Sequence, residues 1–122
     1  MYKTAVRGIV LVAIIISSWG PAFGAEDTMS VNYMLPGCRQ FVSSPPVYNY
    51  NIRLELRGMK CAGIVEGVGF AGSGICGPAT VTTAQAVRVV VKFIEHHPEM
   101  QHKRFPPLAL EALRAAWPCK AH

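Results

Sequence analysis

Apolar residues are unevenly distributed along the chain, and its first part is the most apolar. Residues 9–16 are all apolar, and Lys3 and Arg7 precede them. Trp19-Gly20-Pro21 ends this run, and small residues follow at the two positions that a signal peptidase recognises before Ala25. This order of basic, apolar and small residues predicts a secretory signal peptide.

The predicted signal peptide covers residues 1–24, and residues 25–122 form the exported domain. The apolar run of the leader is much shorter than the roughly 20 apolar residues that a membrane-spanning helix needs. We therefore expect the leader to be cleaved before Ala25, with no membrane attachment afterwards. The exported part has the length of one small domain.

Within the exported domain, apolar residues recur at the three- and four-residue spacing of amphipathic helices. Segments rich in proline, glycine and serine separate the helical stretches. Four such helices in so short a chain predict an all-α fold, a small four-helix or four-to-five-helix bundle. The expected helices cover about residues 30–42, about residues 59–71, the segment from Thr82 to His97, and the segment from Pro106 to Trp117.

The first two helices also carry features that weaken their prediction. Pro36-Gly37 interrupts the first, so we expect that helix to be kinked or to begin late. Residues 52–57 alternate like a strand, but a single strand has no partner here, so we interpret them as a lead-in to the second helix. Gly63 and Gly67 lie opposite the apolar stripe of the second helix, where they would let another backbone approach closely. That stripe consists of Cys61, Ile64, Val65, Val68 and Gly72.

The third and fourth helices have clearer signals. Thr82 and Gln85 form a capping box at the start of the third helix. Its many valines would also suit a strand, but the capping box and the helical spacing favour a helix. Glu111 and Arg114 of the fourth helix are expected to pair on the surface. The expected inward-facing residues are Val87, Val90, Val91 and Ile94 in the third helix and Ala109, Leu110, Leu113, Ala116 and Trp117 in the fourth.

All four cysteines lie in the exported domain, which predicts two disulfides. If the third and fourth helices form an antiparallel hairpin, the open ends of that hairpin bring Cys76 and Cys119 together. The end of the first helix and the start of the second bring Cys38 and Cys61 together. We therefore predict the pairs Cys38–Cys61 and Cys76–Cys119, although four cysteines allow three connectivities in all. No C-x₂-C pair is present, and we expect no metal site.

Other candidate chemistry in the sequence is weak. Residues 67–72 match G-x-G-x-x-G, but a dinucleotide site needs that pattern between a strand and a helix, and here it follows a helical stripe. The formal net charge of +5 falls to +3 when Lys3 and Arg7 leave with the leader, and the remaining basic residues are scattered. No serine or cysteine is placed beside a base as a nucleophile requires. We expect no cofactor, no nucleic-acid partner and no enzymatic activity.

A histidine-rich segment between the third and fourth helices is the remaining candidate. His96, His97 and His102 surround Glu99, but their spacing does not suit a metal site on one helical face, and Pro98 interrupts it. The segment is polar, basic in balance and flexible in composition, which suits a loop that contacts another protein. The candidate partner-binding residues are His96, His97, Glu99, Met100, Gln101, His102, Lys103 and Arg104.

Several short motifs follow one another in a fixed order through the exported domain. They are Cys61-Ala62-Gly63-Ile64-Val65-Glu66-Gly67, Cys76-Gly77-Pro78, Gln85 early in the next helix, His97-Pro98 at its end, Ala112-Leu113, and Trp117-Pro118-Cys119. In this order and spacing the motifs resemble the Rap/Tai family of immunity proteins, which protect against peptidoglycan amidases delivered by type VI secretion. Cys38 extends the resemblance to the first helix.

The resemblance implies a periplasmic, all-helical, disulfide-bonded protein that binds an amidase effector and blocks its active-site cleft. It also implies a homodimer, the form in which related immunity proteins act. The matched positions are mainly cysteines, glycines and prolines, so the resemblance assigns no contact residue. The loop from His96 to Arg104 is our own hypothesis for the contact, because its basic balance suits an acidic cleft.

Two other non-enzymatic functions fit the same residues. A periplasmic holdase of the acid-stress type also uses a small disulfide-bonded helical bundle, and three histidines in one loop would change charge near ~pH 6. A structural protein of the cell envelope, without an inhibitory role, is the other alternative. Exposure of apolar surface in acid would distinguish the chaperone from the immunity protein.

Overall fold

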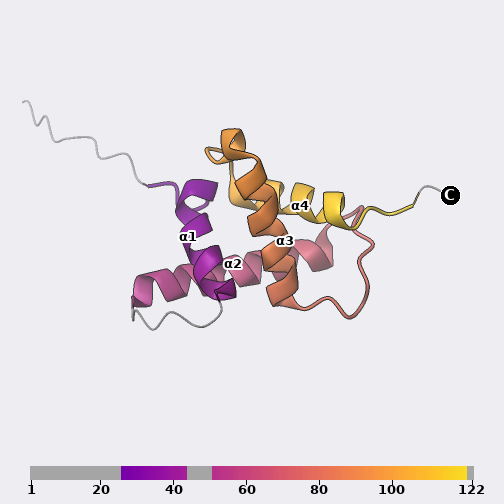
Figure 1. Ribbon diagram of the computed structural model, residues 1–122, viewed down its shortest axis with the longest axis horizontal. Helices are drawn as coiled ribbons and strands as arrows, with labels where there is room; N and C mark the ends of the chain where they lie inside the picture. The colour runs from indigo at the N-terminus through magenta and orange to yellow at the C-terminus, as the bar shows by residue number, and fades with distance from the viewer. Residues whose placement is uncertain (1–25, 44–50, 121–122) are drawn as a thin grey trace, which may run out of the picture.

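The computed structural model describes residues 26–43 and 51–120, and these residues form helices and the turns between them (Figure 1). Among the described residues there is no strand, only isolated bridges between Ser30 and Arg104 and between Ile75 and Pro118. The all-α prediction is therefore confirmed. The predicted signal peptide lies outside the described residues. The helices are α1 (Val31–Val42), α2 (Ile52–Ala71), α3 (Thr83–His96), the short 3₁₀ helix η1 (Pro98–Met100) and α4 (Phe105–Ala116).

The first helix is continuous through its proline. α1 begins directly after Ser30, whose hydroxyl accepts a hydrogen bond from the backbone N–H of Tyr33, and Pro36 lies inside it. A proline inside a helix removes one backbone donor and leaves the carbonyl four residues earlier without its partner. That carbonyl belongs to Asn32, and both Asn32 and Pro36 are exposed, so water can replace the lost bond. The prediction of a late start was therefore wrong.

The second helix begins seven residues earlier than the expected start at Met59, and the interpreted lead-in is its first part. The side chain of Asn51 accepts hydrogen bonds from the N–H groups of Arg53 and Leu54 and so caps the helix. The strand-like alternation of this segment arises because Ile52 and Leu56 are apolar but exposed. Figure 1 shows α2 as the long helix that α1 and α3 both cross.

α1 and α2 approach each other closely where two glycines meet. A Cβ atom placed on Gly37 would lie 2.5 Å from Cβ of Arg57 and 2.8 Å from the backbone N of Gly58. A Cβ atom on Gly58 would lie 3.0 Å from the carbonyl oxygen of Gly37. Gly37 has no room for a side chain and Gly58 has very little, so the Pro-Gly pair that suggested a broken helix instead marks the place where the two backbones come together.

The third helix follows its prediction, and the fourth departs from it in part. The hydroxyl of Thr82 accepts a hydrogen bond from the backbone N–H of Gln85, which confirms that half of the capping box. In α4 the buried residues are Phe105, Leu108, Ala109, Ala112 and Leu113, whereas Ala116 of the predicted stripe is exposed and Leu110 and Trp117 are half-buried. Arg114 donates to the carbonyl and hydroxyl of Ser73 rather than pairing with Glu111. The buried face is therefore rotated relative to the predicted stripe, and it includes Phe105, the fully buried first residue of the helix.

Both predicted disulfides are confirmed, in different surroundings. Cys38–Cys61 is fully buried between α1 and α2. Cys76–Cys119 is exposed, and its cysteines meet because the connection after α2 runs beside the end of α4, where Cys76 N–H donates to the carbonyl of Trp117.

The hydrophobic core lies where α1, α3 and α4 pack on α2. The largest fully buried side chains are Phe105, Met34, Ile94, Leu108 and Leu113.

Within residues 26–43 and 51–120, no helix combines the length and the hydropathy that crossing a membrane requires.

Candidate functional site

The segment between α3 and α4 is folded into hydrogen-bonded turns. At the end of α3 the ring of His97 packs on Phe93, with 4.3 Å between ring centroids, and its Nδ1 donates to the Phe93 carbonyl 2.7 Å away. The turns of η1 follow, in which Met100 N–H donates to the carbonyl of His97 and Lys103 N–H to that of Met100. The segment that is flexible in composition thus contains several backbone hydrogen bonds of its own.

The same loop accepts hydrogen bonds from the first backbone N–H groups of α1. The first four N–H groups of a helix have no partner inside the helix. Here the N–H of Val31 donates to the carbonyl of Lys103 at 3.0 Å, and the N–H of Asn32 donates to the carbonyl of Gln101 at 3.1 Å. Ser30 accepts the next two through its hydroxyl and its carbonyl. The loop is thus attached to the N-terminus of α1 as well as to the two helices that it connects.

The candidate partner-binding residues divide into two groups by exposure. The half-buried members support the loop from inside, as His97 does through its ring contact with Phe93. The exposed members carry both signs of charge with a basic excess. The half-buried residues are His97, Met100 and Gln101, and the exposed residues are His96, Glu99, His102, Lys103 and Arg104.

The structure brings no metal-binding cluster to this loop. Among the described residues, no three His, Cys, Asp or Glu side chains lie close enough together to hold an ion. The G-x-G-x-x-G match at residues 67–72 occupies the last turn of α2 and its C-cap, as expected from the helical stripe before it.

The outer face of α2 is a second surface, of which the sequence pattern indicated only the two glycines Gly63 and Gly67. Four large apolar side chains are exposed on this helix, and Phe70 is 95% exposed. A Cβ atom on Gly63 or on Gly67 would meet nothing within 4 Å, so the two glycines lie on this open face and not inside the bundle. The signal was present as apolar residues three, four and seven positions apart. The exposed apolar residues of α2 are Ile52, Leu56, Met59 and Phe70.

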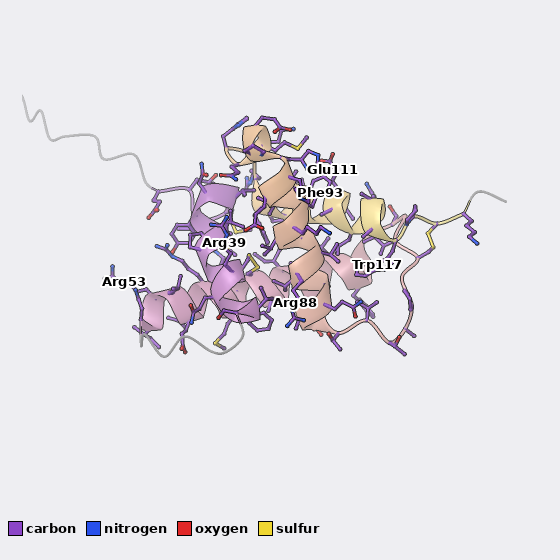
Figure 2. All side chains as sticks on the ribbon, in the orientation of Figure 1. Arg39, Arg53, Arg88, Phe93, Glu111 and Trp117 are labelled. Carbon is purple, nitrogen blue, oxygen red and sulfur yellow. A yellow bond between two sulfur atoms is a disulfide. The ribbon has the colours of Figure 1, made fainter. Side chains whose placement is uncertain are left out.

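Two grooves lie at opposite ends of the molecule. One, of about 380 Å³, is mainly apolar and includes Phe70, Ile75 and Trp117. The other, of about 370 Å³, is mainly charged and includes Arg53, Arg57 and Lys60. Figure 2 shows Arg53 at the far end of α2 from Trp117, so no ligand of ordinary size would occupy both grooves.

Comparison with known proteins places this arrangement in one family. No curated protein and no solved structure matches the chain. Residues 32–119, which include α2, α3, α4, all of α1 except its first residue, and all four cysteines, match the sequence profile of the Rap1a immunity proteins. Because the matched residues are more than half of the chain, it belongs to the Rap1a immunity protein family.

Proposed function

We propose that this immunity protein is exported to the periplasm and there blocks the active-site cleft of a peptidoglycan amidase delivered by type VI secretion. Membership of the family supports the general part of this proposal, the binding of a secreted effector protein, because immunity proteins act in that way. The amidase, the periplasm and the removal of residues 1–24 extend beyond that membership and rest on the sequence resemblance and the leader. The protein needs no catalytic activity for this role.

The observation that carries the proposal is the structure of the loop from His96 to Arg104. A protein that blocks a cleft must present side chains on a backbone that does not collapse when it enters, because ordering a mobile loop on binding costs free energy. The hydrogen bonds from Val31 and Asn32 to this loop fix its backbone before any partner arrives. Its exposed cationic side chains would favour association with an acidic cleft.

The first experiment identifies the partner. The oxidised protein, purified with a tag from the periplasm, is used to capture proteins from a native envelope extract at neutral pH. We expect one stoichiometric partner that cleaves peptidoglycan amide bonds and loses this activity in the complex. Capture of a partner without amidase activity would contradict the proposed target. Capture of many unrelated proteins after acidification would favour the holdase.

The second experiment tests the loop with the same amidase assay. A loop variant replaces Glu99, His102, Lys103 and Arg104 by alanine, which keeps every backbone carbonyl that bonds α1. A control variant replaces the exposed residues Arg88, Lys92 and Glu111 on α3 and α4. We expect at least about tenfold weaker inhibition from the loop variant, the effect of losing one or two charge-assisted hydrogen bonds, and no change from the control. Equal inhibition by both variants would show that the contact lies elsewhere.

We further propose that the outer face of α2 is where a second copy of the chain packs. Exposed Met59 and Phe70 support this, because exposed apolar side chains grouped on one face usually mark an interaction site. Gly63 and Gly67 leave space beside them for a close approach. Light scattering after size exclusion is expected to give the mass of a dimer, and Phe70→Glu with Met59→Glu is expected to give a monomer. A monomeric wild-type protein would contradict this assignment.

A further inference from the structure

The cationic groove is built from one face of α2 and one turn of α1. Arg53, Arg57 and Lys60 are four and three residues apart on α2, so they lie on the same side of that helix. Tyr33 of α1 lies against two of them, with its ring centroid 3.8 Å from Cζ of Arg57 and 5.9 Å from Nζ of Lys60. The groove of about 370 Å³ is lined by Glu26, Tyr33, Arg53, Leu56, Arg57 and Lys60.

Arg57 is held in position by α1. Gly37 leaves room for the first carbon of its side chain, and the ring of Tyr33, one turn earlier, covers a face of its guanidinium. Stacking leaves the edge of a guanidinium, where its N–H groups point, to bind acceptors. Within the described residues, the Nε atom of Arg57 is buried and has no hydrogen-bond partner. Buried donors without a partner are rare in folded proteins, and none of the described residues supplies an acceptor for this one.

The positive charge of the groove is not neutralised by the residues described. Lys60 donates to the backbone carbonyl of Thr28 at 3.1 Å, which fixes its position but leaves its charge. The ion pair found within residues 26–43 and 51–120 joins Arg39 and Glu95, away from the groove. Glu26 lines the groove without forming an ion pair there. One carboxylate side chain, that of Glu26, therefore already fits in the groove. The cationic side chains outnumber it and can bind a second carboxylate.

We propose that this groove binds an acidic peptide segment of a protein partner, with carboxylates at the cations and an apolar side chain on Leu56. The guanidinium of Arg57 and the apolar wall formed by Leu56 suit a chain that carries both kinds of group. A flat membrane surface fits less well, because the cationic side chains line a groove and not a flat surface.

The groove is also connected to the loop proposed to enter the effector. Lys60 of the groove donates a hydrogen bond to the carbonyl of Thr28, just before α1. Val31, the first residue of α1, donates to the carbonyl of Lys103 in the loop. The inference rests on the proposed function only in taking the partner to be a protein, and it does not require an amidase.

The test measures the binding of a fluorescein-labelled peptide, in which glutamate and leucine alternate, to the oxidised full protein. Binding is followed by fluorescence anisotropy at low salt. We expect Arg57→Gln to weaken binding about tenfold, the loss expected for a charge-assisted hydrogen bond. Arg57→Lys keeps the charge but loses the planar donors, so it should fall between Arg57→Gln and the wild type. Arg88→Gln, an arginine on α3 labelled in Figure 2, is the matched control and should leave binding unchanged.

Three outcomes would overturn the inference. The first is equal affinity of Arg57→Gln and Arg88→Gln for the peptide. The second is displacement of the peptide by inorganic phosphate at equal concentration, since the site would then be one for small anions. The third is binding to phosphatidylglycerol vesicles that depends on the same residues in the absence of peptide binding. Each variant is first checked by thermal unfolding, and if Arg57→Gln fails to fold, Arg53→Gln with Lys60→Gln makes the same comparison.

The same variants separate this inference from the proposed function. If the groove variants bind the peptide normally while the loop variant loses inhibition of the amidase, the groove is not a peptide site and the immunity mechanism stands. If the groove variants lose the peptide and no amidase partner exists, the acidic-peptide site stands without the proposed target.

Discussion

The pair α1–α2 and the pair α3–α4 hold their helices together by different means. α1 meets α2 at two glycines, Gly37 and Gly58, beside the fully buried disulfide Cys38–Cys61. α3 and α4 contribute stripes of aliphatic side chains to the core. The other disulfide, Cys76–Cys119, is exposed and joins the connection after α2 to the end of the chain. Close contact between backbones requires residues of low helix propensity, whereas packing between stripes requires only helical spacing.

The two disulfides provide the largest expected difference between these regions. The chain-entropy model gives about 3 kcal/mol for closing the shorter loop and about 4 kcal/mol for the longer one. We nevertheless expect Cys38→Ala with Cys61→Ala to lower the free energy of unfolding more than Cys76→Ala with Cys119→Ala. The first pair also leaves a cavity in the core, and the end held by the second can open locally.

Urea unfolding of both double variants measures this difference. The comparison between the regions would fail if the exposed pair cost more than the buried one. Limited reduction followed by alkylation and mass spectrometry gives an independent reading, since the exposed Cys76–Cys119 bond should be reduced first.

The glycine contact provides the next largest effect. Gly37→Ala places a Cβ atom within 3 Å of backbone and Cβ atoms of α2, so the two helices must separate. We expect a loss of about 2–3 kcal/mol in the free energy of unfolding, the range for overpacked sites. Gly69→Ala is the matched control, because its Cβ atom would make only an ordinary contact, 3.7 Å from Cδ1 of Leu113, and alanine favours a helix by about 0.5–1 kcal/mol. A stable Gly37→Ala variant would show that the close contact is not needed.

The cap of α3 tests the other region. Thr82→Ala removes the hydroxyl that accepts a hydrogen bond from Gln85 N–H and is expected to cost about 1 kcal/mol. Thr82→Ser keeps the hydroxyl and should restore most of that loss. If both variants unfold at the same urea concentration, the hydroxyl has no part in stabilising the helix.

The smallest expected effect concerns the ion pair that connects the regions. Arg39 of α1 donates to Glu95 of α3 at 2.8 Å, with both side chains about half exposed. Exposed pairs of this kind contribute about 0–1 kcal/mol and weaken with salt. In a double-mutant cycle with Arg39→Gln and Glu95→Gln, we expect a coupling of about 0.5 kcal/mol that disappears in high salt. A larger coupling that persists in salt would indicate a tighter connection between the two pairs of helices.

The pair α3–α4 was easier to predict from the sequence than the pair α1–α2, because of the different ways in which the two pairs are held together. The cap at Thr82 and the stripe of α3 depend on neighbouring residues, so they can be read locally. The continuous path of α1 through Pro36 depends on a contact with α2 that no local pattern contains. The start of α2 was placed too late because Ile52 and Leu56 are apolar and exposed, which imitates a strand.

The candidate surfaces were predictable only in part. A polar, basic segment between two helices is visible in the sequence, and so the loop from His96 to Arg104 could be proposed. Its attachment to Val31 and Asn32 could not, since those hydrogen bonds use backbone atoms that every residue shares. The cationic groove was missed for another reason: Arg53 and Arg57 look like scattered charges until α1 brings Tyr33 beside them.

The main-chain bonds between the loop and α1 have one more consequence, which concerns how such a protein can diversify. The carbonyls of Gln101 and Lys103 that hold the loop are present whatever side chains those residues carry. In the contact that we propose for this loop, substitutions at His102, Lys103 or Arg104 can therefore change the side chains that meet the partner while the backbone keeps its shape. A lineage that must follow changes in a hostile toxin gains from this separation, because each new specificity starts from a scaffold that already folds.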